Sequence, residues 1–315
     1  MAGLPVQQLS DAQPQSSMLQ MKEVLHETLT AKDAQLIQRY FLRYDCENLA
    51  LMLEGAIRNG ATAEAEPGSA VSTVRLDLGY LKDEVRRELD LPEEKPFDKR
   101  GNYSQEDLQQ LIEEARSKDG AVKGFPVFMA DFIREFDLRA GQHNWFARDA
   151  VLLAYYDYAR QCPNAMMAEW YDLNFNILNI LTALIARKQG WTLEDYVQGS
   201  GPVAEALLKQ AGQPDFGLTG ELDYMKDLLQ AAETTDPVEK ERQIDALRWN
   251  WLEEKTFFEP FDITALFAYV VRTEILERWA LLDPEQGRER FTEIIEGLRG
   301  EARVPEEFVR PKAAK

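Results

Sequence analysis

The residue pair with the clearest metal-binding spacing is Glu23 and His26, which form one Glu-x-x-His motif. A di-iron helical bundle needs two such motifs, one on each of two helices. The sequence contains only two histidines, and Ala140 stands where His143 would need its glutamate. We therefore expect no metal site, and we expect His26 to be an ordinary surface residue of a helix.

Motifs for other kinds of catalysis are missing as well. The sequence contains no glycine-rich phosphate-binding loop, no G-x-S-x-G nucleophile motif and no H-E-x-x-H zinc motif. Its acidic clusters, at 84–88, 92–94 and 113–114, lie among lysines and arginines, as is typical of a solvated helix face. We expect no catalytic residues and no cofactor, while an enzyme that uses carboxylates alone remains an alternative.

One polar pattern occurs twice, in apolar stretches far apart in the chain. Residues 44–53 read YDCENLALML and residues 175–184 read FNILNILTAL, so two polar pairs occupy equivalent positions: Asp45 with Asn48, and Asn176 with Asn179. Asparagine is a poor residue for a helix interior, and burying its amide without a partner costs about 1–3 kcal/mol. Each asparagine therefore needs specific partners, which are either loops and helix ends in two equivalent units or groups on another protein.

The second pair belongs to a longer polar stripe on one predicted helix. Residues at steps of three and four share one narrow face of this helix: Asp172, Asn176, Asn179, Ala183 and Arg187. The rest of the helix, over 163–188, is apolar around most of its circumference. This pattern is typical of a central helix surrounded by others.

Hydrophobic residues recur with helical spacing along most of the chain, and strand alternation bounded by hairpin turns is not evident. Thr30 and Asp33 resemble a capping box, and Asp45 is a plausible N-cap for a separate helix that ends at Gly60. Further helices are expected at 104–115, 126–136, 145–159, 163–188, from about 221, and at 237–255, 262–282 and 284–298. The sequence thus predicts an all-α fold with helices in antiparallel pairs.

Composition narrows the classes of function. The chain has 315 residues, of which 45% are hydrophobic, so it can form the cores of two or three domains. Its net charge of -19 opposes binding to nucleic acid or anionic lipid. The aromatic residues of the stretch 246–261 could otherwise stack on nucleic-acid bases, so we expect them to pack in the core instead. Cys46 and Cys162 lie in apolar helical patterns, which favours a reducing, cytoplasmic setting. The longest uncharged stretch, 173–186, is too short and polar to span a bilayer.

An Asp/Asn-x-x-Asn-Leu/Ile helix that recurs in an acidic, all-helical chain resembles the C subunit of the archaeal-type and vacuolar-type rotary ATPases, which is known as the d subunit in eukaryotes. Residues 261–282, FDITALFAYVVRTEILERWALL, look like the C-terminal helix of that family, and the match is carried by Tyr269, Glu274, Glu277 and Arg278. More closely, the chain resembles an uncharacterised bacterial family encoded beside vacuolar-type ATPase genes. The resemblance rests on the stretches AGLPV, FLRYDCENL, WYDLNFNILNILTAL and LRWNWLEEKTFFEPFDITALFAY.

The sequence departs from these families in two places. Members of the bacterial family usually have a few more apolar residues before the Leu-Pro pair near the start, and the sequence alone does not decide whether this N-terminus is truncated. The charged segment over 73–118 has no clear counterpart in the rotary-ATPase family, and its role is not indicated by the sequence.

The resemblance implies three related helical units arranged as a funnel, plus a charged peripheral helical segment. We expect the first unit at 1–72, the charged segment at 73–120, the second unit at 121–215 and the third at 216–315. The implied function is that of a non-catalytic part of the central stalk of a V/A-type rotary ATPase, which couples the rotor shaft to the membrane. Such a protein seats the shaft on the membrane proteolipid ring, so it is cytoplasmic and peripheral to the inner membrane. Its partners are shaft and ring proteins, without nucleic acid and without direct membrane insertion.

Interface residues are expected among the repeated and resembling positions: Asp45, Asn48, Asp172, Asn176, Asn179, Arg187, Tyr269, Glu274, Glu277 and Arg278. We expect the polar stripe and the matching helix ends to shape the funnel interior. On that hypothesis, Asn179→Leu weakens assembly more than folding. A helical adaptor unrelated to the ATPase remains a second alternative.

Overall fold

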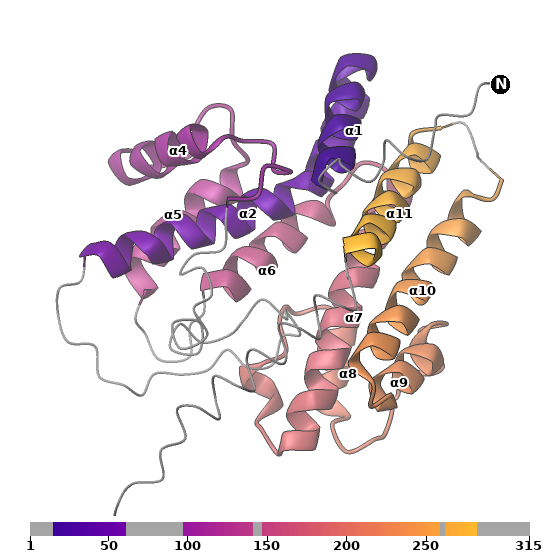
Figure 1. Ribbon diagram of the computed structural model, residues 1–315. Helices are drawn as coiled ribbons and strands as arrows, with labels where there is room; N and C mark the ends of the chain where they lie inside the picture. The colour runs from indigo at the N-terminus through magenta and orange to yellow at the C-terminus, as the bar shows by residue number, and fades with distance from the viewer. Residues whose placement is uncertain (1–14, 61–96, 141–146, 259–261, 282–315) are drawn as a thin grey trace, which may run out of the picture.

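The computed structural model describes residues 15–60, 97–140, 147–258 and 262–281. Within these ranges the chain forms ten α-helices, a short 3-10 helix and no strand, which confirms the predicted all-α fold (Figure 1). No helix in the described part is long and apolar enough to cross a membrane. The funnel arrangement and the boundaries of the helical units remain predictions.

The N-terminal half is built around α2 (Ala31–Gly60). Helix α6 (Ala147–Ala159) packs along α2, and α5 (Val127–Arg139) packs against both of them. Helix α4 (Gln105–Ser117) in turn covers α5. In Figure 1 these helices form the upper left part of the molecule, with α2 and α6 side by side.

The C-terminal half is built around α7 (Ala165–Gln189). The 3-10 helix η2 (Leu193–Asp195) and α8 (Pro202–Lys209) follow α7 and pack against it. Helix α9 (Met225–Glu233) also contacts α7 and packs against α10 (Pro237–Thr256). Helices α9 and α10, which a short connection joins, are neighbours in space, as Figure 1 shows.

Helix α11 (Ile263–Leu281) joins the two halves, because it packs against α7, α10 and α1 (Gln15–Thr28). Its Phe267 is completely buried. The Phe267 ring lies edge-on to Tyr40 of α2 and to Tyr171 of α7, with ring centroids 5.4 and 6.2 Å apart. Such aromatic contacts add to the free energy gained by burying the rings. Helix α11 thus brings residues from both halves into one hydrophobic cluster.

Several predicted helix boundaries are confirmed. Ser104 and Asp107 form a capping box at the start of α4, and the Asn164 side chain caps the start of α7. Gly190 ends α7 in the left-handed conformation, with φ of 71°, which glycine adopts without strain. The helix predicted at 284–298 lies outside the described residues.

The prediction that Asp45 begins a separate helix is wrong. Helix α2 runs without a break from Ala31 to Gly60, and Asp45 lies near its middle and is fully buried. The helix continues because apolar residues on both sides of Asp45 line the same buried face. The Asp45 carboxylate does not cap its own helix, since it accepts hydrogen bonds from the loop before α4.

The described part of the charged segment, from residue 97, packs against the rest of the protein. In its described part, α4 buries Leu108, Leu111 and Ile112 against its neighbours. These three positions follow the helical period, so one face of α4 is apolar while the charged residues occupy the other. The loop 97–104 is also anchored, because its residues bond to α2.

Candidate functional site

Asn48 and Asn179, the repeated asparagines, are both 1% exposed and make the same pair of hydrogen bonds. The Asn48 side chain donates from Nδ2 to the carbonyl of Asp98 and accepts from the Asp98 N–H, both at 2.8 Å. The Asn179 side chain donates to the carbonyl of Gln198 at 2.9 Å and accepts from the Gln198 N–H at 3.0 Å. Each side-chain amide therefore satisfies both backbone groups of a single loop residue.

These two contacts occupy equivalent places in the chain. In each case a long helix, α2 or α7, carries the asparagine, and the loop that it binds leads into a shorter helix, α4 or α8. A buried peptide group without partners is costly, so each asparagine allows its loop to lie against an apolar helix. The structure thus gives both asparagines loop partners within the chain, one of the two roles that the sequence left open.

Asp45, one turn before Asn48, fixes the same loop at a second point. Its carboxylate accepts hydrogen bonds from the backbone N–H groups of Asn102, at 2.8 Å, and Tyr103, at 3.0 Å. The Asn102 side chain donates a further bond to Asp45 at 3.0 Å and another to the Gln38 carbonyl at 2.9 Å. The corresponding residue of the second polar pair, Asn176, lies half-buried beside Tyr224. The two polar pairs therefore share the asparagine contact but differ at the position three residues before it.

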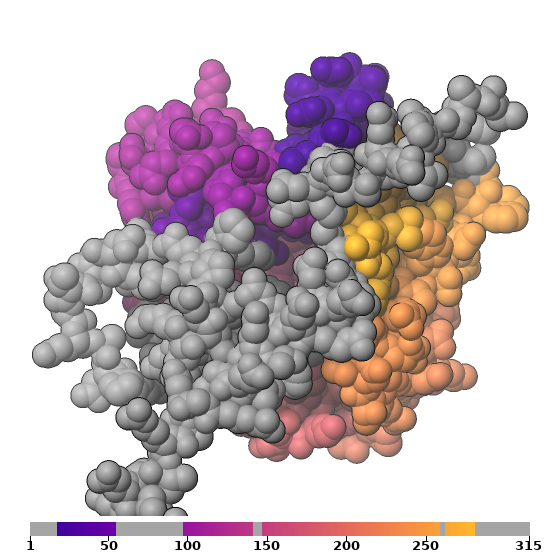
Figure 2. Space-filling model, viewed as in Figure 1, coloured from indigo at the N-terminus to yellow at the C-terminus, as the bar shows by residue number. Residues whose placement is uncertain are grey.

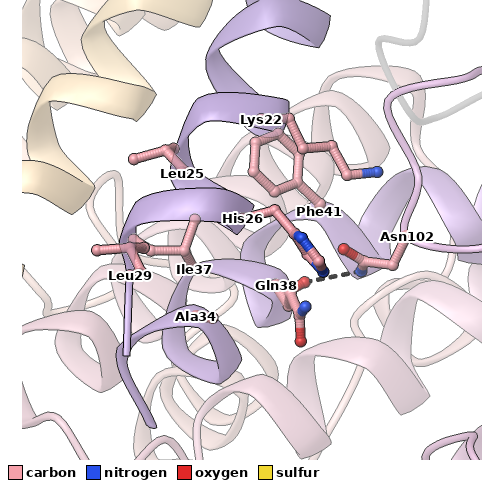
Figure 3. A pocket seen from close by; sticks show the side chains of 9 residues that line it. All are labelled: Lys22, Leu25, His26, Leu29, Ala34, Ile37, Gln38, Phe41 and Asn102. Atoms are coloured by element: carbon pink, nitrogen blue, oxygen red, sulfur yellow. Dashed lines mark hydrogen bonds between the residues drawn. The ribbon is translucent and has the colours of Figure 1, made fainter. Parts of the chain in front are cut away.

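Lys22 of α1 holds the loop from the other side. Its ammonium group donates to the carbonyl of Arg100 at 3.2 Å and to that of Gly101. Burial lowers the pKa of Lys22, while the nearby carboxylates of Asp45 and Asp98 partly oppose this effect. Figure 3 shows Lys22 beside Phe41, with His26 and Asn102 turned toward each other across a small cavity. The cavity measures about 30 Å³, which is room for a single water molecule.

Gly101 lies so close to Asp45 that its lack of a side chain matters. A Cβ at this position would overlap Oδ1 of Asp45 and lie 3.0 Å from its Cγ. We expect Gly101→Ala to displace the carboxylate and lower the free energy of unfolding by about 1–3 kcal/mol, the usual cost of overpacking. Thermal unfolding followed by circular dichroism measures the change. Gly212→Ala is the control, because nothing lies within 4 Å of a Cβ there; equal melting temperatures for the two variants would contradict the predicted clash.

The buried Asp45 carboxyl should make stability depend on pH. Burial raises its pKa from 3.8 to about 7, although the hydrogen bonds from Asn102 and Tyr103 oppose the shift. The folded chain then binds a proton at Asp45 more tightly than the unfolded chain does. The contribution of Asp45 to the free energy of unfolding therefore falls as the pH rises from 3.8 to about 7. Urea unfolding at several pH values across this range should show the free energy of unfolding decreasing. The Asp45→Asn variant should lack the part of this decrease that Asp45 causes. An unchanged slope in Asp45→Asn would contradict the assignment.

Glu274 of α11 forms a second polar cluster, which we call the Glu274 cluster: Tyr40, Arg43, Tyr44 and Glu274. Oε2 of Glu274 accepts a hydrogen bond from the Tyr40 hydroxyl at 2.6 Å, and Oε1 accepts one from the Tyr44 hydroxyl at 2.5 Å. Arg43 forms an ion pair with the same carboxylate. The Arg43 guanidinium also lies over the rings of Tyr40 and Tyr44, at 4.3 and 4.7 Å from their centroids.

Electrostatics in the Glu274 cluster favour the charged carboxylate. Burial by itself would raise the pKa of Glu274, but Arg43 and the two tyrosine hydroxyls outweigh this effect and lower the pKa. The Glu274 side chain is 17% exposed, so the ion pair is largely shielded from water. The cluster joins α2, near the start of the chain, to α11, near its end. Its evident effect is to hold these two helices together.

The remaining predicted residues of α11 divide between buried contacts and the surface. Glu277 is buried and accepts a hydrogen bond from the Met18 N–H at 3.4 Å. Arg278 pairs with Glu241, at 3.2 Å, and with the buried Asp245 of α10. Tyr269 is 61% exposed and takes no part in the Glu274 cluster.

The polar stripe on α7 is divided in the same way. Arg187, at its end, donates to the carbonyls of Gln213 at 2.6 Å and Pro214 at 2.8 Å, and its guanidinium lies over the Phe216 ring. Asp172, at its start, is exposed and lies 3.5 Å from Arg160. The central and C-terminal part of the stripe therefore anchors the loops after α7, and Asp172 is its most exposed polar member.

Several residues of these sites carried no clear sequence signal. Asp98 and Gln198 make decisive contacts but belong to no recognisable motif, and Arg43 lies in the stretch FLRYDCENL without having been singled out there. The one hint was the spacing of Tyr40, Arg43 and Tyr44, which places a basic residue on an apolar helix face. His26 is exposed, as predicted, and no described group of three or more histidines, cysteines or carboxylates is placed to hold a metal ion.

The fold and the contacts of the described residues define an all-helical protein in which polar side chains fasten loops and helix α11 to the two long helices α2 and α7. A family model described as "protein of unknown function (DUF2764)" matches residues 72–302. Because this match covers more than half of the chain, the chain belongs to that family. No protein of curated function and no solved structure matches the chain. The family description assigns no activity, so a function has to be argued from the contacts themselves.

Proposed function

We propose that this chain is a non-catalytic coupling part of the central stalk of a V/A-type rotary ATPase, in the position that the C subunit holds in the archaeal-type enzyme. In that position it would seat the rotor shaft on the proteolipid ring. The observation that carries the proposal is the asparagine contact made twice, by Asn48 with Asp98 and by Asn179 with Gln198. The rotary-ATPase family is built from related helical units, and a contact repeated in equivalent units of one chain is what such a construction leads us to expect.

The Glu274 cluster supports the same proposal through its mechanical effect. A part that transmits torque between shaft and ring must move as one body, since a compliant link would lose work in deformation. Close packing makes protein interiors stiff. In this chain α11 is fixed to α2 by an ion pair and two hydrogen bonds and is packed against α7 through Phe267. These contacts tie the beginning, middle and end of the described chain together.

Charge supports a protein partner over a lipid surface. The net charge of -19 disfavours contact with anionic lipid, so attachment to the membrane would run through the ring proteins. Electrostatic complementarity mainly speeds and orients docking, while buried apolar contacts supply most of the affinity. Basic loops of the ring or shaft would therefore be drawn to this chain and then held by apolar contacts.

Affinity purification from the native host tests the proposed complex. A tagged copy of the chain, extracted in gentle detergent, should bring down shaft and ring proteins, identified by mass spectrometry and present in constant proportion. The Asp172→Ala variant, which changes the most exposed polar residue of the stripe, should fold normally and reveal whether that residue contacts a partner. Failure of both shaft and ring proteins to copurify with the unchanged chain would overturn the proposal.

A further inference from the structure

A groove of about 720 Å³ lies between the start of α2, the end of α10 and the N-terminal half of α11. Leu29 and Asp33 line one side, while Phe257, Ile263 and Tyr269 are among the residues of the other side. The groove does not overlap the asparagine contacts or the Glu274 cluster. Figure 2 shows α10 and α11 at the surface of the molecule, near α1.

Aromatic side chains are unusually exposed at this groove, so the expectation that the stretch 246–261 packs in the core is wrong at Phe257 and Phe258. Phe257 is 70% exposed and Tyr269 is 61% exposed, and both line the groove. Phe258, next to Phe257 in sequence, is 87% exposed, and the two rings are in edge-on contact with centroids 4.9 Å apart. Large exposed apolar groups that gather at one place mark a binding surface, and aromatic residues are common binding hot spots.

Charge at the groove points to the kind of partner. Asp33 and Glu253 line it, together with Asp262, whose carboxylate already accepts hydrogen bonds from the backbone N–H groups of Thr264 and Ala265. Among the described lining residues only Arg272 is basic. The Arg272 guanidinium lies 5.2 Å from the centre of the Trp249 ring of α10, and its Nε and Nη2 atoms are buried without a hydrogen-bond partner. The accessible rim is therefore acidic, and it complements a basic partner rather than an acidic one.

We propose that this groove binds an amphipathic helix of a partner protein, with apolar side chains on one face and lysine or arginine at its margins. The groove is formed by helices, and the described chain has no strand edge that an extended peptide could join. A helix laid into a groove is then the recognition mode that fits. Aromatic rings would receive the apolar face, and the carboxylates of Asp33 and Glu253 would pair with the basic margins. This inference concerns the surface itself and does not depend on the ATPase assignment.

Fluorescence anisotropy with designed peptides tests the groove on the full chain. The probe is a labelled amphipathic helical peptide of leucine and lysine, compared with a leucine and glutamate peptide and a serine and lysine peptide of equal charge. The leucine and lysine peptide should bind at least tenfold more tightly than either of the others. Its affinity should fall at least tenfold in the double variant Phe257→Ser, Tyr269→Ser, which leaves the charge of the protein unchanged.

Leu138→Ser is the matched control for the double variant. Leu138 is 79% exposed on α5, on the opposite side of the molecule from α11 in Figure 1, and its replacement should leave peptide affinity unchanged. Circular dichroism verifies that all variants are folded. Absence of binding, equal affinity for the double variant, or equally tight binding of the serine and lysine peptide would overturn the proposal. So would a dimer of the unchanged chain, seen by analytical ultracentrifugation, that the double variant converts to monomer, because the occupant would then be a second copy.

Discussion

Glu274→Gln should lower the free energy of unfolding by about 3–5 kcal/mol, the usual cost of removing one partner from a buried ion pair. Glutamine keeps the shape of the side chain but leaves Arg43 without its opposite charge. It also offers one acceptor oxygen where Tyr40 and Tyr44 now donate to two. Urea denaturation followed by helical circular dichroism measures the loss.

Glu254→Gln is the matched control for this variant. It makes the same chemical change on α10, where the side chain is exposed and water solvates the charge. We expect a change within about 0.5 kcal/mol there. If Glu274→Gln were as stable as Glu254→Gln, the Glu274 cluster would not hold α11 to α2.

Acid should weaken the same cluster. The pKa of Glu274 is lowered in the folded chain, so its contribution to stability is present above the ordinary carboxyl pKa and is lost as the pH falls through the lowered value. The difference in stability between the unchanged chain and Glu274→Gln should therefore shrink in acid. The pH dependence is opposite to that expected for Asp45, whose contribution to stability falls as the pH rises.

Leucine in place of either repeated asparagine should lower the free energy of unfolding by about 3 kcal/mol. Asn179→Leu leaves the N–H and carbonyl of Gln198 without partners, and each unpaired buried group costs about 1–3 kcal/mol. Asn48→Leu does the same to Asp98, so the two variants should lose similar amounts. Urea unfolding of both variants provides the comparison.

Asn250→Leu, at an exposed position of α10, is the control for both asparagine variants. It should change stability by no more than about 0.5 kcal/mol. The internal contacts of Asn179 also revise the sequence-based hypothesis that leucine there would weaken assembly more than folding, since we now expect a clear loss of folding stability. Variants at 48 and 179 that unfold no more easily than Asn250→Leu would show that the repeated contact does not stabilise the chain.

Helix positions were predictable because their signals are local. Each of these signals affects only residues a few positions away in the sequence: the 3.6-residue period, the Ser104 capping box, the Asn164 N-cap and Gly190. The equivalence of Asn48 and Asn179 was visible for the same reason, since both lie in the same short pattern. Asp45 misled the prediction because an aspartate before an apolar run is a common N-cap, and nothing nearby revealed that its partners lie in the loop at 102–103.

Partners across the fold could not be predicted from the sequence. Asp98 is far from Asn48 along the chain, and Glu274 is farther still from Tyr40 and Arg43. Local patterns carry no information about which loop or helix returns to a given face, because that depends on the packing of the whole chain. Glu274 was singled out through a family resemblance, while its partners on α2 became apparent only in three dimensions.

The most direct test of the central claim is the coupling of ATP hydrolysis to ion transport in membranes from a host that lacks this chain. The ATPase in these membranes should still hydrolyse ATP but should not build an ion gradient, measured with a fluorescent dye for the gradient. Adding back the purified chain should restore the gradient, whereas an unrelated acidic helical protein should not. A full gradient in membranes without the chain would contradict the proposed role.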